Sequence, residues 1–183
     1  RNLGINPYPA NLFPVKHTSK QIKASFEEGK KVIVAGRLMS VRDQGKACFA
    51  ELQDSEGRIQ LYVNRDVLCE GDDKTLYNQV FKKLTDLGDF IGIEGELFTT
   101  QVGAKCIRVS GFTFLSKTLR PLPLPKVDED GNVHDAFNDA ELRYRMRYVD
   151  LVVNPQVKEV FVKRTKLFTA MRTSFNERGY MPV

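Results

Sequence analysis

The sequence predicts a mainly β fold, namely a small barrel of five strands that is followed by a separate helical segment. The stretch 45–63 alternates with period two on both sides of a Ser-Glu-Gly turn, which is typical of two paired strands. One longer strand precedes this pair, and an amphipathic helix and two more strands follow it. Prolines then become frequent, and helical periodicity replaces the alternation from residue 139 onward.

The composition is that of a soluble globular protein, with 42% hydrophobic and 28% charged residues among 183. Cys48, Cys69 and Cys106 are far apart and the two histidines are isolated, so we expect free thiols in a reducing compartment and no metal site. No apolar run reaches the roughly 18 residues of a membrane span, which predicts no membrane partner. The chain starts at Arg and ends without a closing element, so we expect a fragment of a longer protein.

The net charge of +5 is concentrated in residues 139–183, whereas residues 1–138 are nearly neutral. A protein that binds nucleic acid without sequence preference usually carries a stronger basic field. Composition alone therefore does not indicate nucleic-acid binding by the first part of the chain.

Residues 1–30 are predicted to form an extended arm and one short helix. Three prolines within the first 17 residues favour the arm. The stretch 18–21, Thr-Ser-Lys-Gln, has the pattern of a capping box at a helix start. The helix should present Ile22 and Phe26 on one face and end by Gly29.

Residues 31–117 are predicted to form the barrel. A strand over 31–42 contains Gly36, which suggests a bulge of the kind that a small barrel needs for closure. After the paired strands, apolar residues at three- and four-residue steps between Leu76 and Leu87 predict a helix, and strands over 90–100 and 105–115 follow. The order of three strands, one helix and two strands is the layout of the OB-fold, a five-stranded Greek-key barrel.

One aromatic residue stands on the polar face of the paired strands. The alternation places Phe49 beside Arg58 and Gln60, opposite the apolar set. A ring among such groups suits the stacking of a nucleic-acid base, although a neighbouring loop or helix could also cover it. OB-folds bind along strands two and three and the adjoining loops, and Arg42 and Lys46 flank the first of these loops. The layout therefore favours stacking on Phe49.

Residues 118–138 are predicted to be a linker, and 139–183 a helical segment. The linker contains alternate prolines over 121–125 and an acidic turn over 128–131. A helix should begin at 138–141 and present Leu142, Met146, Val149 and Val153 on one face. The arginines and tyrosines over 143–148 could contact RNA. Packing of these side chains on a neighbouring domain is favoured. Asn154-Pro155 starts a long helix whose apolar stripe requires a missing partner or a second subunit.

Several segments together resemble the lysyl-tRNA synthetase family of class II. They are 36–42 (GRLMSVR), 45–49 (GKACF), 52–54 (LQD), 57–63 (GRIQLYV), 119–123 (LRPLP) and 143–151 (RYRMRYVDL). The resemblance implies that this chain carries the anticodon-binding domain of such an enzyme. It implies that Phe49 stacks on the middle anticodon base, a uridine, that Gln60 hydrogen-bonds the edge of that base, and that Arg42 holds the base or its phosphate.

The remaining implications concern the rest of the site and the longer enzyme. Lys46 is expected to contact a phosphate, and Arg58 shares the binding face; Gly103-Ala104 departs from an acidic position in some members of the family. The stretch 178–183 is similar to the opening of motif 1, the dimer-interface element of class II synthetases. The candidate interface residues are Phe161, Phe168, Met171, Phe175 and Tyr180.

The parent enzyme is implied to be a cytoplasmic homodimer that attaches lysine to tRNA with ATP and magnesium. Motifs 2 and 3 are absent, so we expect no catalytic residue and no cofactor in this chain. Three alternatives stay open: an OB module that binds single strands without sequence preference, the anticodon domain of an aspartyl or asparaginyl enzyme, and a dimerisation fragment without RNA affinity. The first predicts steep salt dependence and little base discrimination, and the last predicts self-association.

Overall fold

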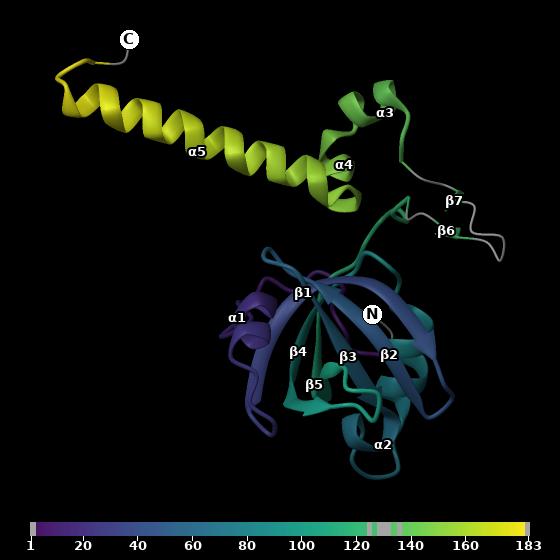
Figure 1. The fold of residues 1–183 in the computed structure, drawn as a ribbon. Helices are drawn as coiled ribbons and strands as arrows, with labels where there is room; N and C mark the ends of the chain where they lie inside the picture. Colours follow the sequence, from purple (N-terminus) through teal and green to yellow (C-terminus); the bar gives the residue numbers. More distant parts are fainter. Residues whose placement is uncertain (1–2, 124–125, 128–132, 135–136, 182–183) are drawn as a thin grey trace. The chain divides into compact units, whose positions relative to one another are not determined.

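A computed structural model describes residues 3–123, 126–127, 133–134 and 137–181 (Figure 1). The chain divides into two compact units, Arg1–Pro121 and Leu122–Val183. The predicted acidic turn over 128–131 and the end of the motif 1 stretch, 182–183, lie outside the described residues.

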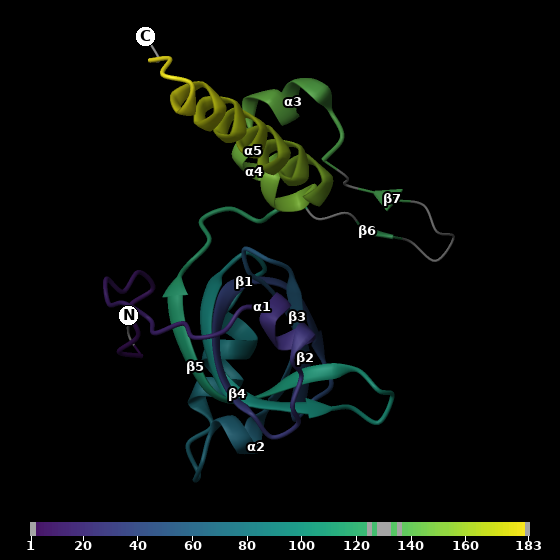
Figure 2. The ribbon, with the colours of Figure 1, turned by 60° about the vertical axis from the view of Figure 1, so that its left-hand side comes forward.

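The first unit is a closed barrel of five strands in the order β1-β2-β3-β5-β4 (Figures 1 and 2). The strands are β1 (Lys31–Asp43), β2 (Ala47–Gln53), β3 (Arg58–Asn64), β4 (Phe90–Thr99) and β5 (Lys105–Ser116). All neighbours are antiparallel except β3 and β5, which run parallel through the pairs Gln60–Cys106, Leu61–Ile107 and Tyr62–Arg108. This arrangement confirms the predicted OB-fold.

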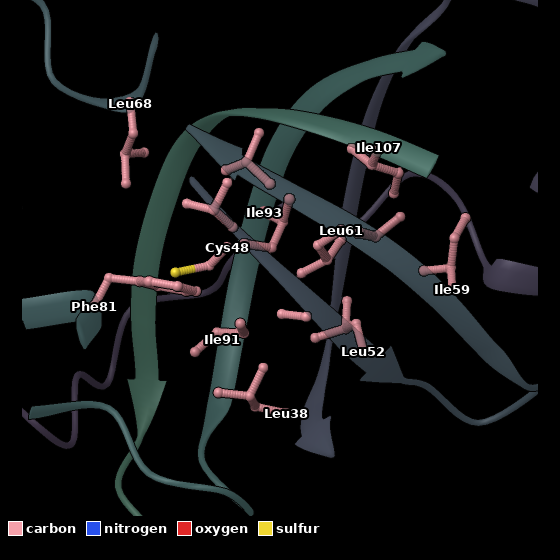
Figure 3. Close-up of a cluster of buried hydrophobic side chains, with 14 of the residues drawn as sticks. Leu38, Cys48, Leu52, Ile59, Leu61, Leu68, Phe81, Ile91, Ile93 and Ile107 are labelled. Atoms are coloured by element: carbon pink, nitrogen blue, oxygen red, sulfur yellow. The ribbon is translucent and has the colours of Figure 1, made fainter. Parts of the chain in front are cut away.

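The core fills the inside of the barrel with one face of every strand. Figure 3 shows Leu38, Leu52, Leu61, Ile93 and Ile107 among the buried side chains, and none of these is more than 1% exposed. Each fully buried aliphatic side chain of this size contributes about 1.5–3 kcal/mol to folding. Because successive residues of a strand face opposite ways, filling the interior with this set leaves the alternate residues for the outer surface.

Gly36 lies where β1 crosses close to β2. A Cβ atom at this position would lie 2.5 Å from the carbonyl oxygen of Gln53, so only glycine permits the approach. The predicted bulge exists, but it falls between Leu38 and Ser40 instead of at the glycine. Gly36 therefore allows the two strands to pack closely, and the bulge allows β1 to bend.

The short helix α1 (Ser19–Ala24) begins with the predicted capping box. The Thr18 hydroxyl accepts from the Gln21 amide, and the Gln21 side chain accepts from the Thr18 amide. The Ser19 amide and hydroxyl also donate to Asp54 in the turn between β2 and β3, which fixes the helix to the barrel. Ile22 is buried as predicted, although the helix ends at Ala24, before Gly29.

Between β3 and β4 the chain forms α2 (Arg65–Leu68) and η1 (Leu76–Leu84), which is a π-helix. The predicted stripe of apolar residues is partly wrong here. Tyr77, Val80 and Phe81 are buried, whereas Leu84 and Leu87 are 52% and 40% exposed. The i→i+5 bonding of a π-helix winds the chain more loosely than an α-helix, so the α-helical spacing selects the wrong members of the buried face.

The second unit contains the pair β6 (Lys126–Val127) and β7 (Val133–His134), and the helices α3 (Ala140–Arg145), α4 (Arg147–Val153) and α5 (Pro155–Glu177). The sequence predicted no strands in this linker. It also predicted one continuous helix in the region of α3 and α4. The structure has two helices here, separated by Met146, whose backbone is non-helical with φ −114°.

The break at Met146 accompanies a buried carboxylate. Arg143 and Arg147 both form ion pairs with Asp150, which is fully buried, and Asn154 donates to it as well. Two of the three arginines that were expected to pack on a neighbouring domain or contact RNA therefore pair with Asp150 instead. A pattern of side-chain types cannot reveal this, because the pairing depends on how α3 and α4 fold together.

Candidate nucleic-acid interface

Three neighbouring strands bring most of the predicted contact residues onto one outer face of the barrel. The register of β2 and β3 places Phe49 opposite Tyr62 and Glu51 opposite Gln60. The register of β1 and β2 places Arg42 beside Phe49. None of these side chains belongs to the buried core, because they alternate with the residues that do.

A hollow of about 270 Å³ opens on this face. Its lining consists of Ser40, Arg42, Phe49, Ala50, Glu51 and Gln60. Three of the five predicted contact residues therefore meet in one hollow. Its walls combine an aromatic ring, a guanidinium, a carboxamide and a carboxylate, which can together stack on a base and hydrogen-bond its edge.

The Phe49 ring is half-buried and rests against a second aromatic side chain. The ring centroids of Phe49 and Tyr62 are 5.2 Å apart, at an angle of 50°. Tyr62 in turn contacts the Phe98 ring edge-on at 5.6 Å. This packing restricts Phe49 from one side, while the part of the residue that lines the hollow stays available for stacking.

Gln60 is oriented by a thiol from another strand. The Cys106 Sγ atom donates to Gln60 Oε1 at 3.3 Å. Burial raises the pKa of the Cys106 thiol, so the thiol remains protonated at neutral pH and can donate. Because the oxygen of the carboxamide is used as the acceptor, its N–H groups are the donors that remain for a ligand.

Arg58 and Lys46 lie outside the hollow. Arg58 donates from Nη1 to Glu51 Oε2 at 2.9 Å and from Nε to Gln53 Oε1 at 2.8 Å. Arg58 therefore holds the Glu51 carboxylate, which does line the hollow. Lys46 is exposed in the turn between β1 and β2, and its carbonyl accepts from the Arg65 amide.

The prediction did not include several side chains of this face among the contact residues. Glu51 and Tyr62 lie on the face that the period-two alternation assigns, so the same signal identifies them once the hollow is considered. Phe98 and Cys106 come from β4 and β5, and Arg108 lies over the Phe98 ring at 4.7 Å. Their proximity depends on the parallel closure of the barrel, which has no local signal.

The second unit carries a separate apolar hollow of about 270 Å³ on α5 and the residues after it. It is lined by Phe168, Met171, Arg172, Phe175, Asn176, Tyr180 and Met181. Four of the five candidate interface residues line it. The fifth, Phe161, instead packs beneath the Arg147 guanidinium at 5.5 Å.

Three further observations concern chemistry elsewhere in the chain. Cys48, Cys69 and Cys106 are free thiols, and all three are buried. In the described ranges no group of three His, Cys, Asp or Glu side chains could hold a metal ion. None of the described helices has the length and apolarity that crossing a membrane requires.

Comparison with known proteins finds relatives of the barrel and of the full chain. Residues 32–115 match the OB-fold nucleic acid binding domain family. The chain is 68% identical to a lysine–tRNA ligase of Christiangramia forsetii, 55% to one of Porphyromonas gingivalis and 54% to one of Azobacteroides pseudotrichonymphae. The matches cover 100% of this chain but 32%, 32% and 37% of the relatives, so the chain spans about a third of their length. The resemblance found in the sequence motifs is thereby confirmed.

Proposed function

We propose that this chain, whose barrel belongs to the OB-fold nucleic acid binding domains, is the anticodon-reading part of a lysine–tRNA ligase. The observation that carries the proposal is the hollow in which Arg42, Phe49 and Gln60 meet. The hollow lies on β2 and β3 and the adjoining end of β1, the surface that OB-folds use for oligonucleotides. The similarity of the whole chain to lysine–tRNA ligases supports the same function.

The middle base of the anticodon, a uridine, stacks on Phe49 in this proposal. A uracil edge presents two carbonyl oxygens with one N–H between them. The Gln60 carboxamide donates to one carbonyl, because its own oxygen accepts from Cys106. The Glu51 carboxylate, which Arg58 holds, supplies an acceptor for the N–H. In this arrangement Gln60 faces the carbonyl at C4, where cytosine carries an amino group. A cytosine would therefore oppose donor to donor at C4 and acceptor to acceptor at N3, at about 1–3 kcal/mol for each polar group left unpaired.

The positive charges of this region act on the RNA backbone. Arg42 lines the hollow, where it holds the base or the adjacent phosphate. Lys46, exposed in the neighbouring turn, contacts a phosphate. Arg58 acts through Glu51, because its donors are directed to Glu51 and Gln53.

The ligation of lysine to tRNA belongs to the longer protein, because this chain covers 32% of the ligase from C. forsetii. We infer that this protein uses ATP and magnesium, works in the cytoplasm and is a homodimer. In the dimer Phe168, Met171 and Phe175 would face the partner; these three side chains are about half exposed in the described chain. No catalytic residue for lysine activation is assigned to the chain.

A fluorescence-anisotropy titration with an anticodon stem-loop tests the proposal. One labelled loop carries UUU, and a second differs only by cytosine at the central position. We expect the UUU loop to bind at least tenfold more tightly, which corresponds to about 1.4 kcal/mol. Equal affinity for the two loops, combined with a steep salt dependence, would instead identify an RNA-binding module that does not read this base.

A further inference from the structure

The turn between β1 and β2 determines how Arg42 and Phe49 face each other. Arg42 and Phe49 are register partners on either side of the turn, which spans 44–46 between the end of β1 and the start of β2. Gly45 has φ +80° there, and its amide donates to Asp43 Oδ1 at 2.8 Å. A small change in this turn would therefore shift the two walls of the hollow relative to each other.

Two side chains of the π-helix η1, Tyr77 and Lys82, are bonded to this turn. Lys82 Nζ forms an ion pair with Asp43 Oδ2 at 2.5 Å and donates to the Gly45 carbonyl at 3.3 Å. The Tyr77 hydroxyl donates to the same carbonyl at 3.2 Å. Burial raises the pKa of the Tyr77 phenol, which keeps its proton available for this bond.

The same network reaches the first residues of β2. The Cys48 Sγ atom lies 3.1 Å from the Tyr77 hydroxyl oxygen and 3.6 Å from Asp43 Oδ1. Cys48 is 1% exposed and directly precedes Phe49 in the strand. The end of β1, the turn and the start of β2 are thus all bonded to two side chains of η1.

Charge gives Lys82 a second effect on the turn. The Asp43 carboxylate follows Arg42 directly and would repel an RNA phosphate bound there. The Lys82 ammonium, whose side chain is 26% exposed, neutralises this carboxylate. The hydrogen bond from Lys82 also holds the pKa of Asp43 below its usual value, so the pair stays ionised at neutral pH.

We propose that Tyr77 and Lys82 are positioning residues, which hold the β1–β2 turn in place. The turn thereby places Phe49 to stack on an RNA base and Arg42 to contact that base or its phosphate. Lys82 additionally removes the repulsion between Asp43 and the RNA backbone. The proposal rests on the anticodon-reading function above. Neither residue touches the RNA in this arrangement, and neither lines the hollow.

The first test compares K82M with K83M in the 183-residue chain. Lys83 is the exposed neighbour on the same helix, so K83M removes an equal charge without touching the turn. We expect K82M to weaken binding of the UUU stem-loop about threefold to tenfold, K82R to restore most of it, and K83M to leave it within about twofold. Y77F should weaken binding in the same direction, and thermal unfolding would verify that every variant folds.

A double-mutant cycle with D43N separates positioning from direct contact. D43N removes the charge but keeps an oxygen that can accept from the Gly45 amide. If Lys82 acts through Asp43, the effects of the two substitutions are not additive, and K82M costs much less affinity in the D43N chain than in the original chain. If Lys82 instead contacts a phosphate, the effects of D43N and K82M add, and the positioning role is wrong.

Hydrogen exchange at the Gly45 amide tests the turn without RNA. We expect faster exchange in K82M and Y77F than in K83M, because the turn loses its bonds to η1. Unchanged exchange together with unchanged RNA affinity would overturn the inference. Equal affinity of the original chain for the UUU loop and the cytosine loop would contradict the proposed function. Faster exchange of the Gly45 amide in K82M and Y77F would, in that case, still show that the η1 contacts hold the turn.

Discussion

The thiol of Cys106 on β5 is fully buried, and it donates to the side-chain oxygen of Gln60 on β3 at 3.3 Å. Carboxamide oxygen and nitrogen are equivalent in shape, so an unpaired glutamine could present either end to a base. In this structure the protonated thiol donates to the carboxamide oxygen, which directs the nitrogen away from Cys106. The contact therefore makes Gln60 a donor toward the hollow, and the base readout proposed here depends on it.

Replacing the Gln60 carboxamide with a carboxylate should turn an attractive contact with the base into a repulsive one. In Q60E a carboxylate would face a uracil carbonyl, and we expect the affinity for the UUU stem-loop to fall by about 1.5–3 kcal/mol. Anisotropy titration measures this loss. Q79E adds the same charge at an exposed position of η1 and should change binding only slightly. An equal loss in both variants would attribute the effect to general repulsion instead of base recognition.

Removing the ring of Phe49 should weaken binding without changing the fold. Base–aromatic stacking contributes about 1–3 kcal/mol for each base, so F49A should lose free energy of binding in that range. F49Y keeps the ring and should retain most of the affinity. Unfolding in urea would verify that both variants stay folded. Full affinity in folded F49A would contradict the stacking role.

The Asp54 carboxylate should stabilise the barrel in a pH-dependent way. It accepts from the amide and hydroxyl of Ser19 and from the amides of Glu56 and Gly57. Burial alone would raise the pKa of Asp54, but these hydrogen bonds lower it overall. Since the folded pKa lies below the unfolded value of about 3.9, the contribution is present above that pH and is lost as the pH falls through the folded pKa.

Urea unfolding of D54N at several pH values tests this contribution. Asparagine keeps one acceptor oxygen but carries no charge, so we expect D54N to lose about 1–3 kcal/mol of unfolding free energy at pH 7. The difference from the original chain should shrink toward pH 3. A constant difference across this range would show that the ionisation of Asp54 is unimportant.

The buried Asp150 should be essential for the packing of α3 and α4. D150A leaves Arg143 and Arg147, whose side chains are about a third exposed, without their acceptor, and we expect the loss of these charge-assisted hydrogen bonds to cost about 1.5–3 kcal/mol. Helical circular dichroism during urea unfolding measures the change. R145M removes an arginine whose only described ion pair is an exposed one with Glu141, and it should change stability by less than about 0.5 kcal/mol. Similar effects of both variants would contradict the role of Asp150.

Period-two alternation predicted the barrel well because a strand that buries one face has apolar residues at every second position of its sequence. Leu52 and Leu61 face the core and Phe49 and Gln60 face outward, as that pattern requires. No local sequence pattern predicts the contact between Gln60 and Cys106, because 46 residues separate them. The sequence therefore identifies the two central strands of the site but not the thiol that orients one of its residues.

Helical segments were predicted less accurately because apolar spacing does not determine how a helix is wound or where it breaks. The i→i+5 bonding of η1 turns Leu84 away from the face of the buried Tyr77, Val80 and Phe81, whereas α-helical spacing places it on that face. The break at Met146 allows Arg143 and Arg147 to reach Asp150. Both features result from tertiary contacts that override local periodicity.

The parallel pairing of β3 with β5 also sets an order of events during synthesis. Strands β2 and β3 leave the ribosome first, so their hairpin and the Phe49 ring can form while β5 is still being made. Until β5 arrives, the Gln60 carboxamide has no thiol partner and can rotate. A nascent chain could thus hold a base by stacking before it can tell one base from another. Selectivity for the base is therefore completed only when the last strand of the barrel has paired.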